Sequence, residues 1–231
     1  MSRSRVVSLV PSITEALASA RPDALVGATD WCTHPEGLEV TRVRGTKNPD
    51  LAAIRALSPD LVVTTKEENR ELDVRRLRAA GLEVWVGDIE TVPDAVAAYE
   101  ELFDDVLGWE RPAWLATARE LWCGPLPPVS RRVAIPIWRD PWMVVGGRTF
   151  TGDLARRLGL ENVFGSAERY PHISLEEIDA AGADVVLLPD EPYVFTDADR
   201  AAFSTPTELV SGRLLTWYGP SLLEAHASLG R

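Results

Sequence analysis

The chain has 231 residues, enough for one large α/β domain or for two lobes of roughly 100 residues each. Apolar residues make up 45% of it, which supports real hydrophobic cores, yet no run approaches the ~18 apolar residues of a membrane span. A formal net charge of −11, spread along the chain, argues against nucleic acid and favours a soluble monomer, and two cysteines make neither a disulfide framework nor a zinc site.

The N-terminal part of the chain predicts alternating strands and helices. Ser12 followed by Glu15 predicts a capping box that opens a helix ending near Ala20. Residues 29–48 form a long connection, and loops of this length inside a domain are usually functional. The other elements expected here are strands at 5–10, 24–28 and 83–86, a helix–turn–strand unit at 51–67 and a helix at 69–80.

Two helical segments follow and lead into a second run of strands and helices. We expect the helices at 91–107 and 111–122, closed by the proline-rich stretch 125–128. The elements expected after them are a strand at 132–138, a hairpin around 139–147, a helix at 151–158, a helix–turn–strand unit at 175–191, a helix at 197–203, a strand at 214–217 and a final helix from 220. Alternating strands and helices predict mostly parallel sheets.

One helix–turn–strand unit occurs twice. Residues 51–67 match residues 175–191 at a constant offset of 124. The identical pairs are Leu51/Leu175, Ile54/Ile178, Ala56/Ala180, Asp60/Asp184, Val62/Val186 and Glu67/Glu191. An offset above half the chain length predicts two similar α/β lobes rather than a solenoid, and clefts between lobes bind small ligands. The alternative is that apolar periodicity alone generates some of these matches.

The order of several short motifs resembles the class III substrate-binding proteins, the helical-backbone receptors of cobalamin and iron–siderophore importers. The motifs are Val6-Val-Ser-Leu-Val-Pro-Ser-Ile-Thr-Glu15, Ser58-Pro-Asp-Leu-Val62, Leu77-Arg-Ala-Ala-Gly-Leu-Glu-Val84 and Gly159-Leu-Glu-Asn-Val-Phe164. Two further segments, Gly45-Thr-Lys-Asn-Pro49 and Lys66-Glu-Glu-Asn-Arg70, look like a subgroup labelled as cobalamin-binding. The resemblance covers nearly the whole chain.

The resemblance implies two α/β lobes bridged by a helical segment, with a ligand cleft between them. We therefore expect an N-terminal lobe at 1–90, bridging helices at 91–128 and a C-terminal lobe at 129–231. Family members bind a bulky metal chelate without catalysis and dock on a membrane permease through one glutamate per lobe. By alignment with the family, those glutamates match Glu71 and Glu176, and the ligand-stacking aromatics match Trp31 and Tyr170.

The chain departs from the family pattern at three points. The bridging helix is about 12 residues, or roughly 18 Å, which is shorter than the family's. Thr65 stands where the cobalamin receptor has a cleft tryptophan. No signal-peptide pattern precedes the fold, so the chain as written is expected in the cytoplasm, or outside it if a leader has been removed. The first two departures concern the identity of the ligand, and the third concerns import.

Aromatic side chains at expected strand ends are the main candidates for ligand contact. Flat rings suit the face of a corrin, porphyrin or siderophore, and parallel sheets bind ligands at the carboxyl ends of their strands. These candidates are Trp31, Trp138, Trp142, Tyr170, Trp217 and Tyr218. The alternative is that some of them simply cover the cores. Trp85, Trp109, Trp114 and Trp122 fall in periodic apolar segments, so we expect them to pack inside the fold.

Cys32 and His34 are the candidate metal ligands. A thiolate and an imidazole both bind transition metals, and His34 suits an axial position on cobalt or iron. A buried thiol and a loop histidine bonded to its neighbours are the commoner arrangement. His172, beside Tyr170, is a similar candidate, whereas His226 on the last helix is expected at the surface.

Cations near the expected strand ends are candidates for binding carboxylate or phosphate groups of a chelate. They are Lys47, Lys66, Arg139 and Arg148. Equally, residues 66–70 can be a solvated helix entry with its acids at the positive end of the helix dipole.

The first hypothesis is therefore a non-catalytic binding protein for a cobalamin-like, haem or ferric-siderophore ligand. It needs no cofactor, and its partners are the small-molecule chelate and an ABC permease, with no nucleic acid and no membrane insertion. The alternatives are a cytosolic chelatase-like enzyme using Cys32, His34, Glu67 and His172, and a metal-chelate sensor that has kept the fold but lost transport.

Overall fold

The computed structural model describes residues 2–230, so Met1 and Arg231, which the expected lobe boundaries include, lie outside the described residues. The chain folds into two units. The first takes the residues up to Ile89, Pro93–Arg119 and Tyr218–Pro220, and the second takes Glu90–Val92, Glu120–Trp217 and the residues from Ser221 on. The expected boundaries at 90 and 128 divide the chain into continuous stretches. The two units instead each include a short segment from elsewhere in the chain, Tyr218–Pro220 in the first and Glu90–Val92 in the second.

The first unit is built on a five-stranded parallel sheet in the order β3-β2-β1-β6-β7. Its strands are β1 (Val6–Ser8), β2 (Leu25–Ala28), β3 (Thr41–Arg42), β6 (Leu61–Thr65) and β7 (Val84–Gly87). β1 and β6 are buried along their whole length, as expected for central strands of a parallel sheet covered on both faces. A small antiparallel ladder joins β4 (Arg44–Gly45) to β5 (Asn48–Pro49) within the long connection.

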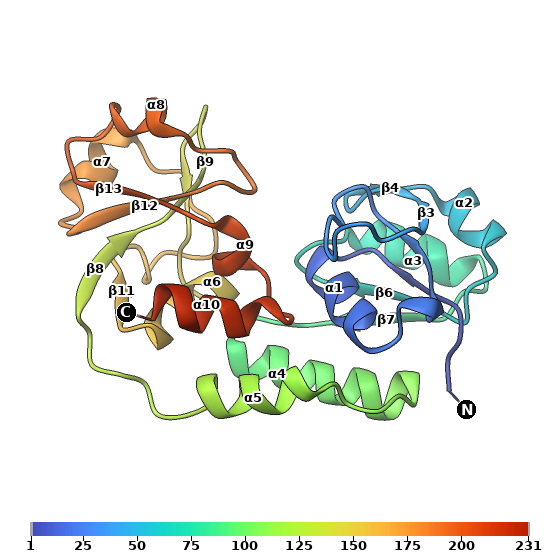
Figure 1. The fold of residues 1–231 in the computed structure, drawn as a ribbon. Helices are drawn as coiled ribbons and strands as arrows, with labels where there is room; N and C mark the ends of the chain where they lie inside the picture. The colour runs from blue at the N-terminus through green and yellow to red at the C-terminus, as the bar shows by residue number, and fades with distance from the viewer. Residues whose placement is uncertain (1, 231) are drawn as a thin grey trace. The chain divides into compact units, whose positions relative to one another are not determined.

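The helices of this unit are α1 (Pro11–Ala20), the 3₁₀ turn Pro22–Ala24, α2 (Leu51–Ala56), α3 (Glu71–Ala79), most of α4 (Val92–Glu101) and α5 (Ala113–Trp122). A π-helical turn over Leu102–Leu107 continues α4 and ends at Gly108, whose φ of 64° only glycine adopts freely. Figure 1 shows α4 and α5 side by side. Glu100 of α4 pairs with Arg119 of α5, and Tyr99 meets Trp114 edge-on at 5.1 Å.

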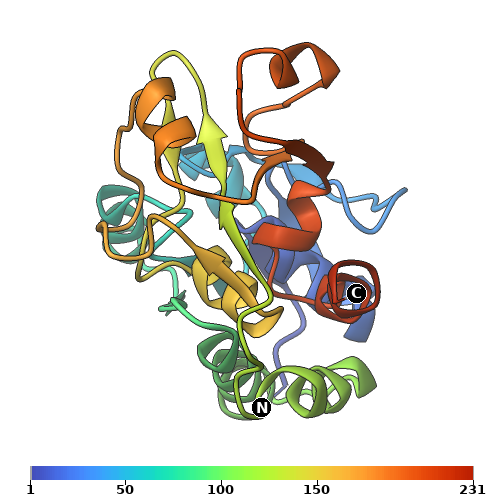
Figure 2. The same cartoon turned by 90° about the vertical axis from the view of Figure 1, so that its left-hand side faces the viewer.

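The second unit has a four-stranded parallel sheet in the order β11-β8-β12-β13. Its strands are β8 (Arg131–Ala134), β11 (Leu160–Asn162), β12 (Val185–Pro189) and β13 (Thr207–Val210), with an antiparallel hairpin of β9 (Pro136–Trp138) and β10 (Met143–Val144) beside them. Figure 2 shows β8 and β9 running in yellow through this unit. Its helices are α6 (Phe150–Arg157), α7 (Leu175–Ala180), α8 (Asp197–Arg200), α9 (Gly212–Thr216) and α10 (Ser221–Leu229).

The two sheets repeat one strand order. In the first unit β2-β1-β6-β7 are neighbours, and in the second unit β11-β8-β12-β13 take the same order, with β3 as an addition to the first sheet. The duplicated sequence forms α2 with β6 and α7 with β12, at equivalent places. The α/β class with two similar parallel-sheet units, expected from the sequence, is confirmed.

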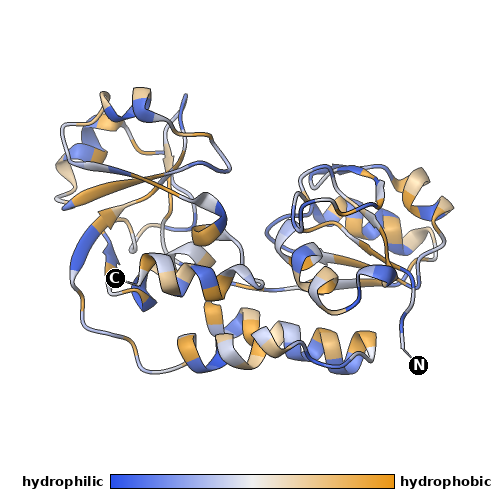
Figure 3. Cartoon of the chain, in the orientation of Figure 1, coloured by the Kyte–Doolittle hydropathy of each residue, from blue (hydrophilic) through white to orange (hydrophobic). Residues whose placement is uncertain are grey.

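Each unit has its own hydrophobic core. The first contains Val7, Leu9, Ile54, Val62 and Leu77, all fully buried, and the second is built around Ala134, Val144, Ile178, Val186 and Leu188. Figure 3 shows the central strand β12 in orange, the apolar end of the scale, whereas β8 begins in blue at its two arginines.

Two local expectations are wrong. Residues 214–217 form part of helix α9 and its end rather than a strand, and the outer strand is β13, whose partly exposed residues give a weak pattern. α1 begins at Pro11, so Ser12 lies inside the helix and makes no capping box with Glu15. Proline at the first helical position fixes φ and replaces the expected cap.

Candidate functional site

The carboxyl ends of the first sheet bring together three separate loops. Because all five strands are parallel, the residues after β1, β2 and β6 meet at one edge, where open α/β sheets bind ligands. Asn69 joins them. It accepts a hydrogen bond from Thr65 N at 3.0 Å and donates from Nδ2 to Leu9 O at 3.2 Å and Thr46 O at 3.1 Å. This buried amide fixes the loop edge and gave no signal in the sequence.

Trp31 lies on this edge, three residues after β2, and its side chain is exposed. The residue keeps 65% of its surface open to solvent. A Cβ on Gly45 would lie 3.2 Å from the indole Nε1, so the ring rests against a position without a side chain. Arg42 supports the loop by donating to the carbonyls of Thr29 and Cys32, each at 2.9 Å. Trp31 is therefore an accessible aromatic surface on an anchored loop.

Cys32 and His34 differ in their surroundings. Cys32 is fully buried, with Sγ 3.0 Å from Thr14 Oγ1 and 3.1 Å from Thr29 Oγ1. Burial raises the pKa of the Cys32 thiol, which favours the neutral form over the thiolate that binds metals. His34 is half-buried, and its Nδ1 lies 3.1 Å from Thr33 Oγ1. A metal-binding role for these two residues stays a prediction.

The lysines after β6 and between β4 and β5 are already engaged. Lys66 pairs with Asp88, and Lys47 donates to the carbonyl oxygen of Glu67 at 2.5 Å. Burial raises the pKa of the Glu68 carboxyl, while nearby Lys47 acts in the opposite direction. The edge therefore presents a mixed polar rim rather than a row of positive charge.

Tyr218, expected at a strand end, is buried in the first unit. Burial raises the pKa of its phenol well above the ordinary value. Tyr99 donates to the Ser12 carbonyl oxygen at 3.3 Å, and a Cβ on Gly219 would lie 2.7 Å from the same oxygen. Tyr218 thus forms the floor of this edge rather than its surface.

The second unit carries a chain of aromatic contacts between the β9–β10 hairpin and the segment after β12. Trp138, which is 44% exposed, meets Tyr193 edge-on at 5.7 Å, and Tyr193 contacts Phe195 at 4.7 Å. Phe195 stacks on Trp142 at 6.0 Å. Trp138 and Trp142 were predicted from the sequence, whereas Tyr193 and Phe195 were not. This cluster ends in an exposed tryptophan, as the first unit's loop edge does.

Arg139 is part of the same cluster. Its guanidinium lies 5.4 Å from the Trp142 ring centroid and pairs with Asp199, and that hydrogen bond raises the pKa of Arg139. Burial alone would raise the pKa of Asp199, but hydrogen bonds from Thr196 and Arg139 bring it below its usual value. Arg139 is thus held by an internal carboxylate.

Tyr170 is half-buried at the start of the segment that runs along β10. Arg169 lies over its ring at 5.9 Å, and Pro171 O accepts from Val144 N at 3.2 Å. Trp217 is buried, with Arg213 at 5.7 Å from its ring centroid, so it packs in the unit.

The other tryptophans are structural. Trp109 and Trp122 are buried, as expected, whereas Trp85 and Trp114 are half-buried. His226 was expected at the surface, but it is half-buried with its ring 5.4 Å from that of Trp122. The expectation failed because α10 packs against the end of α5, which is remote in the sequence.

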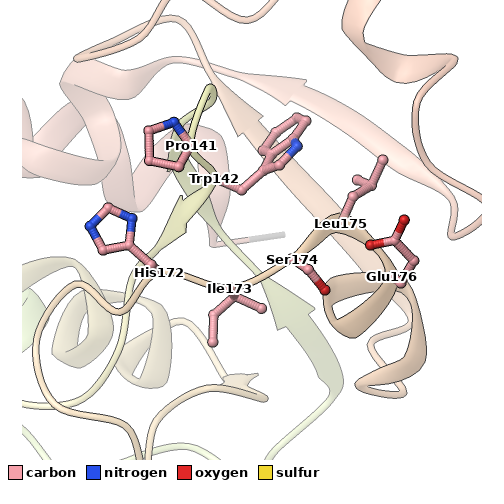
Figure 4. Close-up of a pocket in the computed structure, with 7 residues that line it drawn as sticks. All are labelled: Pro141, Trp142, His172, Ile173, Ser174, Leu175 and Glu176. Atoms are coloured by element: carbon pink, nitrogen blue, oxygen red, sulfur yellow. The ribbon is translucent and has the colours of Figure 1, made fainter.

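The two candidate docking glutamates are exposed in the first turns of their helices. Glu71 is the first residue of α3, and its side chain is 83% exposed. Glu176 lies in the first turn of α7, beside an open pocket of about 460 Å³ that also includes His172 and Trp142 (Figure 4). Exposure at the start of a helix is compatible with docking, which remains a prediction for both residues.

Residues 2–230 contain no group of three or more histidine, cysteine, aspartate or glutamate side chains placed to hold a metal ion. None of the helices in this range combines the length and the apolar character needed to cross a membrane.

Curated relatives share about a quarter of their residues with the chain. The vitamin B12-binding protein of Pectobacterium carotovorum is 25% identical over 234 residues, which covers 96% of this chain and 85% of the relative. The vitamin B12-binding protein of Vibrio vulnificus is 25% identical over 182 residues, covering 75% and 67%. No protein-family model matches the chain.

Solved structures share the fold over almost the full length. The periplasmic vitamin B12 binding protein of Vibrio cholerae superposes with a TM-score of 0.79 at 20% identity, covering 99% of this chain and 95% of that one. A periplasmic heme binding protein from Pseudomonas aeruginosa gives a TM-score of 0.80 at 23% identity, covering 99% and 91%. These matches confirm the family resemblance inferred from the sequence motifs.

Proposed function

We propose that this chain, which has the fold of the class III substrate-binding proteins, is a non-catalytic binding protein for a bulky metal chelate. The chelate class is a corrinoid or a haem, as the names of the similar proteins suggest, or a ferric siderophore, as the resemblance of the sequence motifs implies. The observation that carries the proposal is the exposed indole of Trp31, held over Gly45 at the carboxyl edge of a parallel sheet.

An aromatic surface of this kind is suited to binding a flat macrocycle rather than to catalysing a reaction. A fixed ring offers a large apolar contact at a low cost in conformational entropy. We propose that Trp31 in the first unit and Trp138 and Tyr170 in the second contact the ligand. An enzyme using Cys32 is disfavoured because its thiol is enclosed by Thr14 and Thr29.

We also propose that Glu71 and Glu176 dock the loaded protein on an ABC permease. Both carboxylates are solvent-exposed at helix starts, as a contact to a separate protein requires. This role demands an extracytoplasmic location. The location is testable by determining whether the gene encodes a leader before residue 1.

The binding proposal is tested by titrating the purified chain with cyanocobalamin, haemin and a ferric siderophore, followed by visible absorbance and tryptophan fluorescence. We expect one of these ligands to bind with a Kd in the micromolar range or tighter. Trp31→Ala should weaken that binding about tenfold or more, because it removes a stacking surface worth roughly 1.4 kcal/mol or more.

Trp85→Phe is the matched control. Trp85 is a half-buried tryptophan on β7 whose indole donates to Glu101 at 3.2 Å. The substitution Trp85→Phe should leave the affinity for the chelate unchanged. Absence of binding by all three chelates contradicts the proposal. An equal loss in both variants contradicts the role of Trp31.

A further inference from the structure

Two arginines from separate loops of the second unit converge on one glutamate. Arg169 Nη1 donates to Glu90 Oε1 at 2.9 Å, and Arg148 reaches the same carboxylate through Nε and Nη2, both at 3.4 Å. Arg169 Nη1 also donates to the carbonyl oxygen of Arg148 at 3.2 Å. Glu90 comes from the short segment that precedes α4, so three parts of the sequence build this cluster.

The backbone is shaped to bring the arginines together. Gly147 N donates to Ala167 O at 2.7 Å, and Arg169 N donates to Gly147 O at 3.0 Å. A Cβ on Gly147 would lie 2.4 Å from the carbonyl oxygen of Gly165, so only glycine allows this approach. Arg148 and Arg169 then take φ values of 55° and 51°, a conformation that costs free energy for any residue but glycine.

The two guanidiniums are held differently. Arg169 is anchored by Glu90, by a backbone carbonyl and by its position over Tyr170. Arg148 makes long contacts only, including one of 3.9 Å to Glu168, and its side chain is 69% exposed. Arg148 can therefore turn toward an incoming group while Arg169 keeps its place.

From this geometry we infer that Arg148, Arg169 and Glu90 form a charge-selective subsite for an oxyanion, a carboxylate or phosphate group carried by the ligand. In the structure the Glu90 carboxylate occupies the place of that oxyanion. The inference rests on the proposed function for the ligand that carries the group, because Tyr170 is a candidate ligand contact directly under Arg169.

The chemistry of the subsite follows from the guanidinium. A planar guanidinium binds two oxygens of a carboxylate or phosphate at once, and hydrogen bonds between charged groups are the stronger ones. An anionic ligand must displace Glu90 before it gains these bonds, whereas a neutral ligand leaves Glu90 in place. In this chain, whose net charge is −11, the cluster thus excludes anions that bind the two arginines less strongly than Glu90 does.

Inorganic phosphate is the first probe, used on the full chain without any chelate. Thermal unfolding is measured against phosphate concentration, with sodium chloride at matched ionic strength as the baseline for each variant. We expect Glu90→Gln to bind phosphate at least tenfold more tightly than the original chain. Adding Arg148→Gln to that variant should abolish the gain.

Glu168→Gln is the matched control, because Glu168 is an exposed carboxylate that makes a long contact of 3.9 Å with Arg148. This variant should bind phosphate as the original chain does. A Glu90→Gln variant without the gain, or a gain that survives Arg148→Gln, overturns the inference. Neither result depends on which chelate binds, so this arm fails separately from the proposed function.

A pair of corrinoids tests the link to the ligand. Cyanocobalamin and its monocarboxylate derivative differ by one amide replaced by a carboxylate. We expect Glu90→Gln to improve the affinity for the carboxylate at least threefold relative to cyanocobalamin. An unchanged ratio in a chain that binds both corrinoids overturns the assignment of the subsite to the ligand.

Discussion

At the scale of single residues, the loop edge of the first unit combines accessible and buried groups. Trp31 is open to solvent, while Cys32, its neighbour, is fully buried. Trp31 is identifiable from the sequence because it lies in a long loop and matches the loop aromatic of the family that the motifs resemble. Asn69, Glu90 and Arg169 are not identifiable in this way, because Asn69 bonds Leu9, 60 positions away, and Glu90 bonds Arg169, 79 positions away.

Glu68 offers a pH-dependent test of this edge. Burial raises the pKa of its carboxyl, so the folded state binds the proton more tightly than the unfolded chain does. The stability from this group is therefore complete below the unfolded pKa of about 4.3 and decreases as the pH rises through the interval up to the folded pKa. We expect Glu68→Gln to unfold at a higher temperature at pH 7, with the gain shrinking toward pH 4. Thermal unfolding between pH 4 and 8 measures it.

Glu36→Gln, in an exposed loop, is the control and should give no pH-dependent gain. A lower midpoint for Glu68→Gln at pH 7 would show that Lys47 stabilises the carboxylate by more than its burial costs.

At the scale of elements, the sequence predicts the repeated and buried helices and strands, but it does not predict the outer strands and the short turns. The helix–strand pairs α2–β6 and α7–β12 were predicted because both contain an apolar run of strand length beside a short helix. Residues 214–217 were wrongly expected to be a strand because Leu214, Leu215 and Trp217 are apolar and close together. A run this short does not distinguish a buried helical turn from a strand.

Capping boxes show the same limit. The pattern at Ser12 and Glu15 makes no cap, whereas Ser174 and Glu177 make both capping bonds, with Glu177 N to Ser174 Oγ at 3.2 Å and Ser174 N to Glu177 Oε2 at 2.9 Å. The difference lies in where the chain enters the helix, which tertiary structure decides.

Ser174→Ala should therefore destabilise the protein by about 1 kcal/mol, because the Glu177 backbone N–H loses its acceptor, Ser174 Oγ, at the start of α7. Chemical denaturation measures the loss. Ser166→Ala, at an exposed loop serine, is the control and should stay within about 0.5 kcal/mol of the original chain. Equal effects of the two substitutions would mean that the cap contributes nothing.

At the scale of the whole molecule, each unit includes a short segment from a part of the chain outside its main range. Tyr218–Pro220 belong to the first unit, and Glu90–Val92 belong to the second. Periodicity along the sequence reveals two lobes but not this exchange, because three residues carry no periodic signal.

We expect a fragment of residues 1–128 to unfold about 10 °C or more below the full chain. It lacks the buried Tyr218, whose loss resembles a large-to-small core substitution of roughly 3 kcal/mol. Thermal unfolding followed by circular dichroism measures the difference. Coexpression with residues 129–231 should restore the midpoint, and an isolated fragment as stable as the full chain would refute the exchange.

The three residues Tyr218–Pro220 also set an order for the maturation of the chain during synthesis. Domains generally fold as units from the N-terminus while the ribosome is still translating. The first unit can form only a less stable fold at that stage, because its floor at Tyr218 is translated after almost all of the second unit. The loop edge that carries Trp31 is therefore completed only after nearly the entire polypeptide has been made, so nascent chains should lack a finished site.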